Sequence, residues 1–172
     1  MISLSHTTGY AIHALCYLEF RRGQPRLLHE VARATGVPLP YLGKIMNQLA
    51  RQGLVKAKRG YRGGVTVARP ATEIPLLEVV EAVEGTHWIG DCLLGMTECA
   101  AAICPTRHMW KRVRREIENA LRKYTLADMA KVARSRGWRT AQRAGTSSAK
   151  ALDPRTHGVQ TRRRVRPQSS VG

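Results

Sequence analysis

Three of the four cysteines in this chain lie within one short stretch of sequence. Cys92, Cys99 and Cys104 belong to DCLLGMTECAAAICPTRH (residues 91–108), which ends with His108. Thiols this close along a chain commonly bind a metal, form disulfides or respond to oxidants. The spacing Cys-x6-Cys-x4-Cys-x3-His lacks the CxxC pairs of structural zinc sites. Three thiolates in a flexible loop suit an iron–sulfur cluster, [2Fe-2S] or [4Fe-4S], which is larger than one ion and tolerates looser spacing.

Three cysteines leave such a cluster one ligand short. His108 lies one helical turn past Cys104 and is the nearest candidate, although it could equally be an exposed helix residue. Asp91, Glu98, His6 or a residue of a partner subunit remain alternatives. The fourth ligand therefore stays open, with His108 as the first choice.

Three amphipathic helices are predicted before residue 53. The apolar spacing i, i+3, i+4, i+7 indicates helices near residues 8–20, 28–35 and 42–52. We expect Thr7 or Thr8 to cap the first helix, and Cys16 to be a small buried hydrophobe rather than a ligand. Two short helices joined by a tight glycine-containing turn are typical of a helix-turn-helix.

A hairpin follows the third helix. Residues 55–58 and 65–68 alternate as half-buried strands do, with the turn RGYRGG between them. A hairpin in this place predicts a wing, and hence a winged helix-turn-helix domain over residues 1–85. The third helix would enter the major groove and the wing the minor groove. Each basic residue alone could be merely solvated, so the prediction depends on their co-location. The expected DNA contacts are Tyr41, Lys44, Asn47, Gln48, Arg51, Lys58, Arg59 and Arg62.

A long helix is predicted from residue 106 to about 123. Its apolar positions are spaced by three and four residues in alternation, as in a heptad seam. The rest of the helix is strongly charged, which favours pairing with a second copy over packing within its own domain. TLAD (residues 125–128) predicts a capping box that opens a last short helix, so residues 105–137 form the expected dimerisation region. The predicted seam is Trp110, Val113, Ile117, Ala120 and Tyr124.

The charge of the chain favours a polyanionic partner. Its 172 residues hold 29 Lys and Arg against 12 Asp and Glu, for a net charge of +17, which indicates nucleic acid ahead of a membrane surface. Residues 138–172 predict a disordered basic tail. No apolar run approaches the roughly 20 residues of a membrane span, and the N-terminus lacks an export-signal pattern. We expect a cytoplasmic protein, where structural disulfides are rare.

The chain resembles the Rrf-type bacterial transcription regulators, which include the IscR-, NsrR- and RirA-like iron–sulfur winged-helix proteins. The stretches TGYAIHAL, VPLPYLGKIMNQLARQGLVKAKRGYRGGVTVARP, IPLLEVVEAVEG and DCLLGMTEC…CPTRHMW carry this resemblance. It implies a homodimer whose cluster, held by Cys92, Cys99 and Cys104, controls its grip on a palindromic operator. The cysteine intervals differ from those of the best-known members. Two residues differ as well: Gly43 stands early in the recognition helix where IscR-like members carry Glu, and Arg107 stands at the usual position of the ligand histidine.

The expected fold is mainly α with a small β wing: a winged helix-turn-helix domain, a cysteine-rich cluster loop (86–108) and a long dimerisation helix. Cluster binding would order the loop and set the spacing of two recognition helices. Two alternatives remain: the cysteines form a thiol redox switch without a cluster, or the chain is a general basic nucleic-acid binder. No nucleophile elbow, phosphate loop or pair of carboxylates indicates an enzyme.

Overall fold

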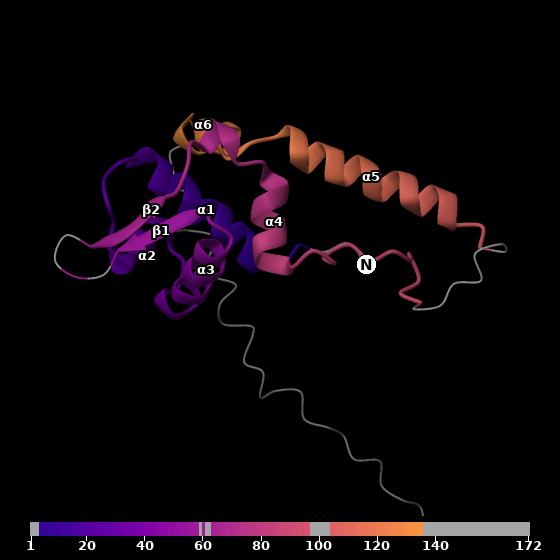
Figure 1. The fold of residues 1–172 in the computed structure, drawn as a ribbon, viewed down its shortest axis with the longest axis horizontal. Coiled ribbons are helices and arrows are strands. Elements are labelled where there is room, and N and C mark those ends of the chain that lie inside the picture. The colour runs from indigo at the N-terminus through magenta and orange to yellow at the C-terminus, as the bar shows by residue number, and fades with distance from the viewer. Residues whose placement is uncertain (1–3, 59, 61–62, 97–103, 136–172) are drawn as a thin grey trace, which may run out of the picture.

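The computed structural model describes residues 4–58, 60, 63–96 and 104–135. Within these residues, a helical body carries a small hairpin, and one long helix extends away from the body (Figure 1). None of the helices described is long and apolar enough to cross a membrane. The elements are α1 (His6–Phe20), α2 (Leu28–Thr35), α3 (Leu39–Arg51), β1 (Val55–Lys58), β2 (Gly64–Val67), η1 (Ala71–Glu73), α4 (Leu76–Glu84), α5 (Arg107–Lys123) and α6 (Leu126–Ser135).

One apolar core holds the body together. The helix α1 is its centre and contacts α2, α3, α4, α6 and β2. The residues of the predicted stripe of α3 are all buried, and α3 presents its polar residues outward. The core includes Ala11, Ala14, Leu15, Leu18, Val31, Leu42, Ile45, Leu49, Ile74, Val79 and Leu126.

The wing has a third strand-like partner that the sequence did not predict. The strands β1 and β2 pair antiparallel, with Val55 opposite Val67 and Lys58 opposite Gly64. The backbones of Arg26 and Val65 then exchange two hydrogen bonds of 3.1 and 2.8 Å. At Gly64 the backbone φ is +146°, and an added Cβ would lie 2.7 Å from the Arg26 carbonyl oxygen. Only glycine therefore allows this close approach of the segment before α2.

Residues 85–123 leave the body and return to it. The segment leaves at Gly85, which follows α4, and returns where the residues around Thr125 pair antiparallel with those around Pro75. The Leu76 amide donates to the Tyr124 carbonyl, and the Leu126 amide donates to the Ile74 carbonyl. We call residues 85–123 the arm and the remaining described residues the body. Because α6 packs on α1, it belongs to the body.

Two local predictions need correction. The helix α1 starts at His6 with Ser5 as its N-cap, so neither Thr7 nor Thr8 caps it. The Thr8 hydroxyl instead donates to the Glu84 carboxylate at the end of α4, which also accepts the Ser5 amide at 2.9 Å. The second strand is Gly64–Val67, one residue earlier than predicted. The capping pair Thr125 and Asp128 is present, with the Thr125 amide 3.0 Å from the Asp128 carboxylate.

Candidate cysteine site and nucleic-acid interface

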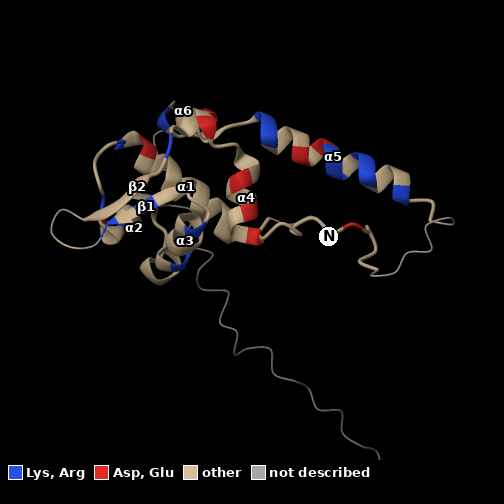
Figure 2. Cartoon of the chain, in the orientation of Figure 1, with Lys and Arg blue, Asp and Glu red and all other residues tan. Residues whose placement is uncertain are grey.

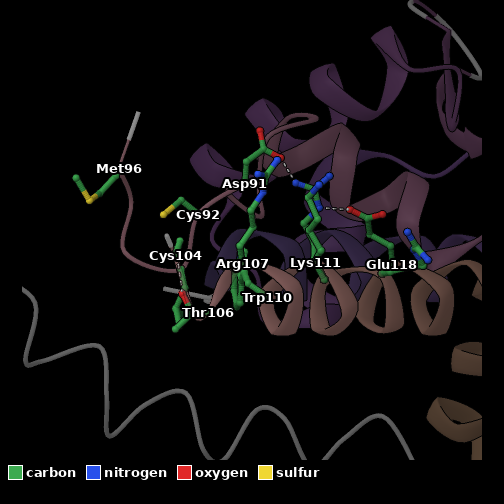
Figure 3. A pocket seen from close by; sticks show the side chains of 12 residues that line it. Asp91, Cys92, Met96, Cys104, Thr106, Arg107, Trp110, Lys111 and Glu118 are labelled. Atoms are coloured by element: carbon green, nitrogen blue, oxygen red, sulfur yellow. Dashed lines mark hydrogen bonds and ion pairs between the residues drawn. The ribbon is translucent and has the colours of Figure 1, made fainter. Parts of the chain in front are cut away.

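Two of the three clustered cysteines line one cavity. A hollow of about 540 Å³ lies between the described part of the cysteine loop and the first turns of α5, and both Cys92 and Cys104 line it. Figure 3 shows the two cysteines at the same end of this cavity. Leu93 and Trp110 add apolar surface to the lining. Cys99 lies outside the described residues.

Cys104 is placed by the start of α5. Its Sγ lies 3.3 Å from the Oγ1 of Thr106, the N-cap residue of this helix. The Arg107 amide, at the first residue of the helix, donates to the Cys104 carbonyl at 3.4 Å. The N-terminus of a helix carries partial positive charge and favours an anionic sulfur over a neutral one. Cys104 therefore occupies a position suited to a thiolate ligand.

The two residues before Cys92 contact two side chains of α5. The Trp110 indole Nε1 donates to the Gly90 carbonyl at 2.8 Å, and Trp110 is only 5% exposed. One turn further along the helix, the Arg114 guanidinium forms an ion pair with Asp91. Arg114 also pairs with Glu118 on its own helix at 3.2 Å. The two residues before Cys92 are thus held against α5.

The predicted fourth ligand lies away from this cavity. His108 is exposed on the first turn of α5 and is absent from the cavity lining, to which Arg107 contributes instead. Of the alternatives, Asp91 lines the cavity, His6 is exposed at the start of α1, and Glu98 lies outside the described residues.

The cavity lining carries an excess of positive charge. Arg107, Lys111, Arg114 and Arg115 of α5 face two acids, Asp91 and Glu118. In Figure 2 the helix α5 is predominantly basic, whereas α4 carries acidic residues. Thiolates, and a cluster bound by them, carry negative charge. Two thiols and basic surroundings therefore suit an anionic centre, while the described residues alone contain no group of three ligating side chains.

Cys16 is separate from this site, as the sequence predicted. It is 1% exposed in the core of the body. Burial, with a smaller contribution from the charge of Glu19, raises its thiol pKa to about 12. Cys16 is therefore protonated at neutral pH and takes no part in the chemistry of the loop.

The exposed face of α3 carries the predicted major-groove residues. Tyr41 (58% exposed), Lys44, Asn47 and Arg51 are exposed, whereas Gln48 is half-buried. Of the predicted wing contacts, Lys58 is exposed at the end of β1, and Arg59 and Arg62 lie outside the described residues. These polar groups lie on a helix whose opposite face is buried in the core, which is the arrangement that a groove-binding helix needs.

The predicted seam residues differ in exposure. Trp110 is covered by its own chain, and Val113 and Ile117 are half-buried. Ala120 is exposed, and Tyr124, the residue after α5, is 55% exposed. The stripe therefore begins under the arm's own loop and becomes more open toward the end of the helix.

Sequence reasoning missed the role of Arg114, and assigned Trp110 to the seam only. Residue spacing shows only that residues 110 and 114 share one face of a helix at i, i+4, and that this helix directly follows the cysteines. What the sequence could not show is which segment covers that face. Arg26 was missed because a lone residue pairing with β2 leaves no alternating pattern.

Comparison with known proteins identifies the family. The model of the Rrf2 family, described as an iron-dependent transcriptional regulator, matches residues 4–132. A protein named aau3 of Rhizobium meliloti is 33% identical over 130 residues, which cover 74% of this chain and 84% of the relative. The family model, which matches residues 4–132, therefore includes residues of both the body and the arm.

Solved structures agree in fold. The chain superposes on IscR of T. potens with a TM-score of 0.61 and 30% identity, covering 76% of this chain and 88% of the other. It superposes on CymR, titled the global cysteine regulator of B. subtilis, with a TM-score of 0.64 and 24% identity, covering 77% and 98%. The second likeness shows the winged-helix fold alone.

Proposed function

Because the chain belongs to the Rrf2 family of transcription regulators, which bind DNA and are not enzymes, we propose that it is a cytoplasmic, homodimeric regulator controlled by an iron–sulfur cluster. Cys92, Cys99 and Cys104 hold the cluster, and α3 with the wing reads a palindromic operator. The single observation that carries this proposal is the shared cavity: Cys92 and Cys104 line it together at the start of the long helix.

Different residues hold the cluster, offset its charge and pair the two subunits. A bound cluster supplies a centre that iron scarcity, nitric oxide or oxidants destroy. The N-terminus of α5 stabilises the anionic sulfur of Cys104, and the basic residues of the lining offset the charge of the centre. Val113, Ile117, Ala120 and Tyr124 pair with a second copy, which fixes the spacing of the two recognition helices. A change in the loop thereby changes the operator affinity.

Purification without oxygen tests the cluster. We expect a brown protein with visible absorption and bound iron, and loss of both on Cys→Ala substitution at position 92, 99 or 104. Cys16→Ala is the matched control, because Cys16 is buried in the body, and it should keep the colour. A colourless, iron-free wild-type protein would overturn the proposal. His108→Ala, Asp91→Ala, Glu98→Ala and His6→Ala, compared by their cluster spectra, test the four candidates of this chain for the fourth ligand. Arg114→Gln, which removes the ion pair of Asp91 but keeps its carboxylate, is the control for Asp91→Ala.

Operator binding at several salt concentrations tests the DNA surface. Replacing Lys44 or Arg51 by Gln should weaken binding and lower the slope of log affinity against log salt by about 0.9 for each lost phosphate contact. Arg122→Gln is the control, because Arg122 is an exposed charge at the far end of α5. Equal effects of all three variants would mean that only overall charge matters.

A thiol switch without a cluster is the second candidate. It is favoured by the same cavity, since Cys92 and Cys104 both line it and a reversible disulfide between two of the clustered thiols needs no iron. Peptide mass mapping after mild peroxide distinguishes the two: a Cys92–Cys104 disulfide in a protein that never binds iron supports the switch.

General nucleic-acid binding through the basic tail is the third candidate. Deleting residues 139–172 removes eight basic residues and one acid. If operator selectivity survives the deletion, the tail only adds non-specific affinity. If selectivity is lost while the shortened protein remains folded by circular dichroism, the tail is the DNA-binding element and the proposed role of α3 is wrong.

A further inference from the structure

We infer that Trp110 and Arg114 are positioning residues for Cys92: they fasten residues 90 and 91 to α5, and so set where the Cys92 sulfur lies relative to that of Cys104. The inference rests on the proposed function for its relevance to a cluster. Its geometric part concerns two cysteines and one helix, and can be tested with or without iron.

The two cysteines reach the cavity by different routes. Cys104 lies three residues before α5 and is held by contacts with Thr106 and Arg107 at the helix start. Cys92 lies fifteen positions before this helix. Its carbonyl accepts a hydrogen bond from the Gly95 amide at 3.2 Å, a turn within the loop that does not connect it to α5. Its position therefore depends on whatever fixes the chain just before it.

Two contacts fix that chain on one face of α5. Trp110 donates to the Gly90 carbonyl at 2.8 Å, and Arg114 pairs with Asp91. Residues 110 and 114 are one helical turn apart, so consecutive loop residues meet consecutive turns of the helix. Ile89, just before them, is 6% exposed and so is also buried. We call these two contacts, Trp110 with Gly90 and Arg114 with Asp91, the clamp. Through the clamp, the position of the Cys92 sulfur depends on α5, the same helix that holds Cys104.

The two contacts differ in strength. Trp110 is almost completely covered, so its hydrogen bond is shielded from water and its ring fills space under the loop. The Asp91 side chain is 86% exposed and that of Arg114 34% exposed, so this ion pair is weakened by solvent. We therefore expect Trp110 to contribute more than Arg114 to holding the residues before Cys92 in place. We expect Arg114 to determine which turn of α5 Asp91 contacts.

Cluster lifetime provides the first test. Trp110→Phe keeps an aromatic ring but removes the donor, and should shorten the half-life of visible absorption in the presence of a chelator roughly two- to tenfold. Arg114→Gln should shorten it by up to about fivefold. Arg112→Gln is the matched control, because Arg112 is an exposed arginine of the same helix outside the cavity lining. Equal lifetimes in all four proteins would overturn the inference.

A double-mutant cycle separates positioning from general loosening. If Asp91 and Arg114 act through their ion pair, the double variant Asp91→Asn with Arg114→Gln should have a cluster half-life no shorter than that of the single variant with the shorter half-life. Additive losses would mean that the pair does not act as a clamp. The melting temperature of the cluster-free variants, compared with wild type, shows whether the body remains intact.

Cross-linking of the cluster-free full chain provides a readout independent of iron. A short thiol-to-thiol reagent, mapped by peptide mass spectrometry, should join Cys92 to Cys104 in wild type and in Arg112→Gln, and should do so severalfold less in Trp110→Phe. An unchanged yield in Trp110→Phe would overturn the inference. If wild type cross-links as expected but never binds iron, the clamp stands and the cluster proposal fails.

Discussion

The body and the arm are held together by different physical means. The body is one apolar core around α1, in which Leu15, Leu18, Leu42, Ile45, Leu49 and Leu126 are at most 1% exposed. In the described part of the arm, Ile89 and Trp110 are the only hydrophobic side chains counted as buried, and Leu93, Leu94, Met96 and Met109 are exposed. The arm is positioned by its anchored ends, by contacts of α5 with α4 and by a few polar contacts.

This difference matches the two tasks of a regulator. A surface that reads DNA must keep its geometry, and an interior packed like a crystal does this. A sensor must change when its ligand is lost, and a segment with few buried contacts can rearrange at low cost. The comparison therefore supports the proposed division, in which the body reads DNA and the arm senses, and each prediction below is a way to test it.

The largest effect should come from the core of the body. Leu15→Ala removes a fully buried side chain from α1, so we expect a loss of about 2–5 kcal/mol in the free energy of unfolding. Leu94→Ala, the same change at a 69% exposed residue of the arm, should cost less than about 0.5 kcal/mol. Denaturant unfolding measures both. Similar losses would show that the arm is packed as tightly as the body.

The second effect tests the wing within the body. Gly64→Ala would place a Cβ within 2.7 Å of Arg26 at a φ of +146°, and we expect a cost of about 1–3 kcal/mol together with weaker operator binding. Gly60→Ala is the control, because Gly60 also has a positive φ, of +92°, but an added Cβ meets no atom within 4 Å. The Arg26 contact is unimportant if the two variants unfold at the same denaturant concentration.

The two regions also differ in how well sequence predicts them. The bounds of α1, α2 and α3 lie within about three residues of the predicted ranges, because each apolar stripe is buried against the same core. The largest difference is at the start of α3, which begins at Leu39 rather than at residue 42. The hairpin and the Thr125–Asp128 cap were predictable for a related reason: their signals are local in the chain.

Side-chain contacts between residues far apart in the chain could not be predicted from the sequence. Thr8 looked like a cap, but its hydroxyl bonds to Glu84, which is 76 residues away. Trp110 looked like a seam residue, yet its indole meets Gly90 of the same chain. His108 was the first choice for the fourth ligand and stays a prediction, although Arg107 and not His108 lines the cavity. In each case a side chain's partner depends on tertiary packing, which residue spacing does not record.

A third, smaller effect concerns Gly43 in the recognition helix. A Cβ added there meets no atom within 4 Å, and its backbone is helical. Gly43→Ala should therefore stabilise the body by about 0.5–1 kcal/mol, because glycine loses more conformational freedom on folding. If the absent Cβ serves close approach to DNA, operator affinity should fall while stability rises. A parallel rise in both would mean that Gly43 has no role in recognition.

The smallest effect lies at Glu84, where the body meets the arm. Partial burial raises the pKa of this carboxyl, but hydrogen bonds from Ser5 and Thr8 outweigh burial and lower it overall. A carboxyl with a lowered pKa stabilises the fold at neutral pH, and this contribution is lost as the pH falls below about 4.3 and through the folded-state pKa. Because the group is largely exposed, we expect less than about 1 kcal/mol.

Glu84→Gln isolates that contribution, since Gln keeps an oxygen acceptor but not the charge. The free energy of unfolding of wild type should exceed that of the variant at pH 7, and the difference should disappear near pH 3. Glu116→Gln, at an exposed acid on α5, removes the same charge in the arm and controls for the change in net charge. If the difference in the free energy of unfolding between wild type and Glu84→Gln stays constant from pH 7 to pH 3, the charge of Glu84 does not contribute to the contact between α4 and the start of α1. The junction would then be an extension of the apolar body rather than a polar contact of the kind that holds the arm.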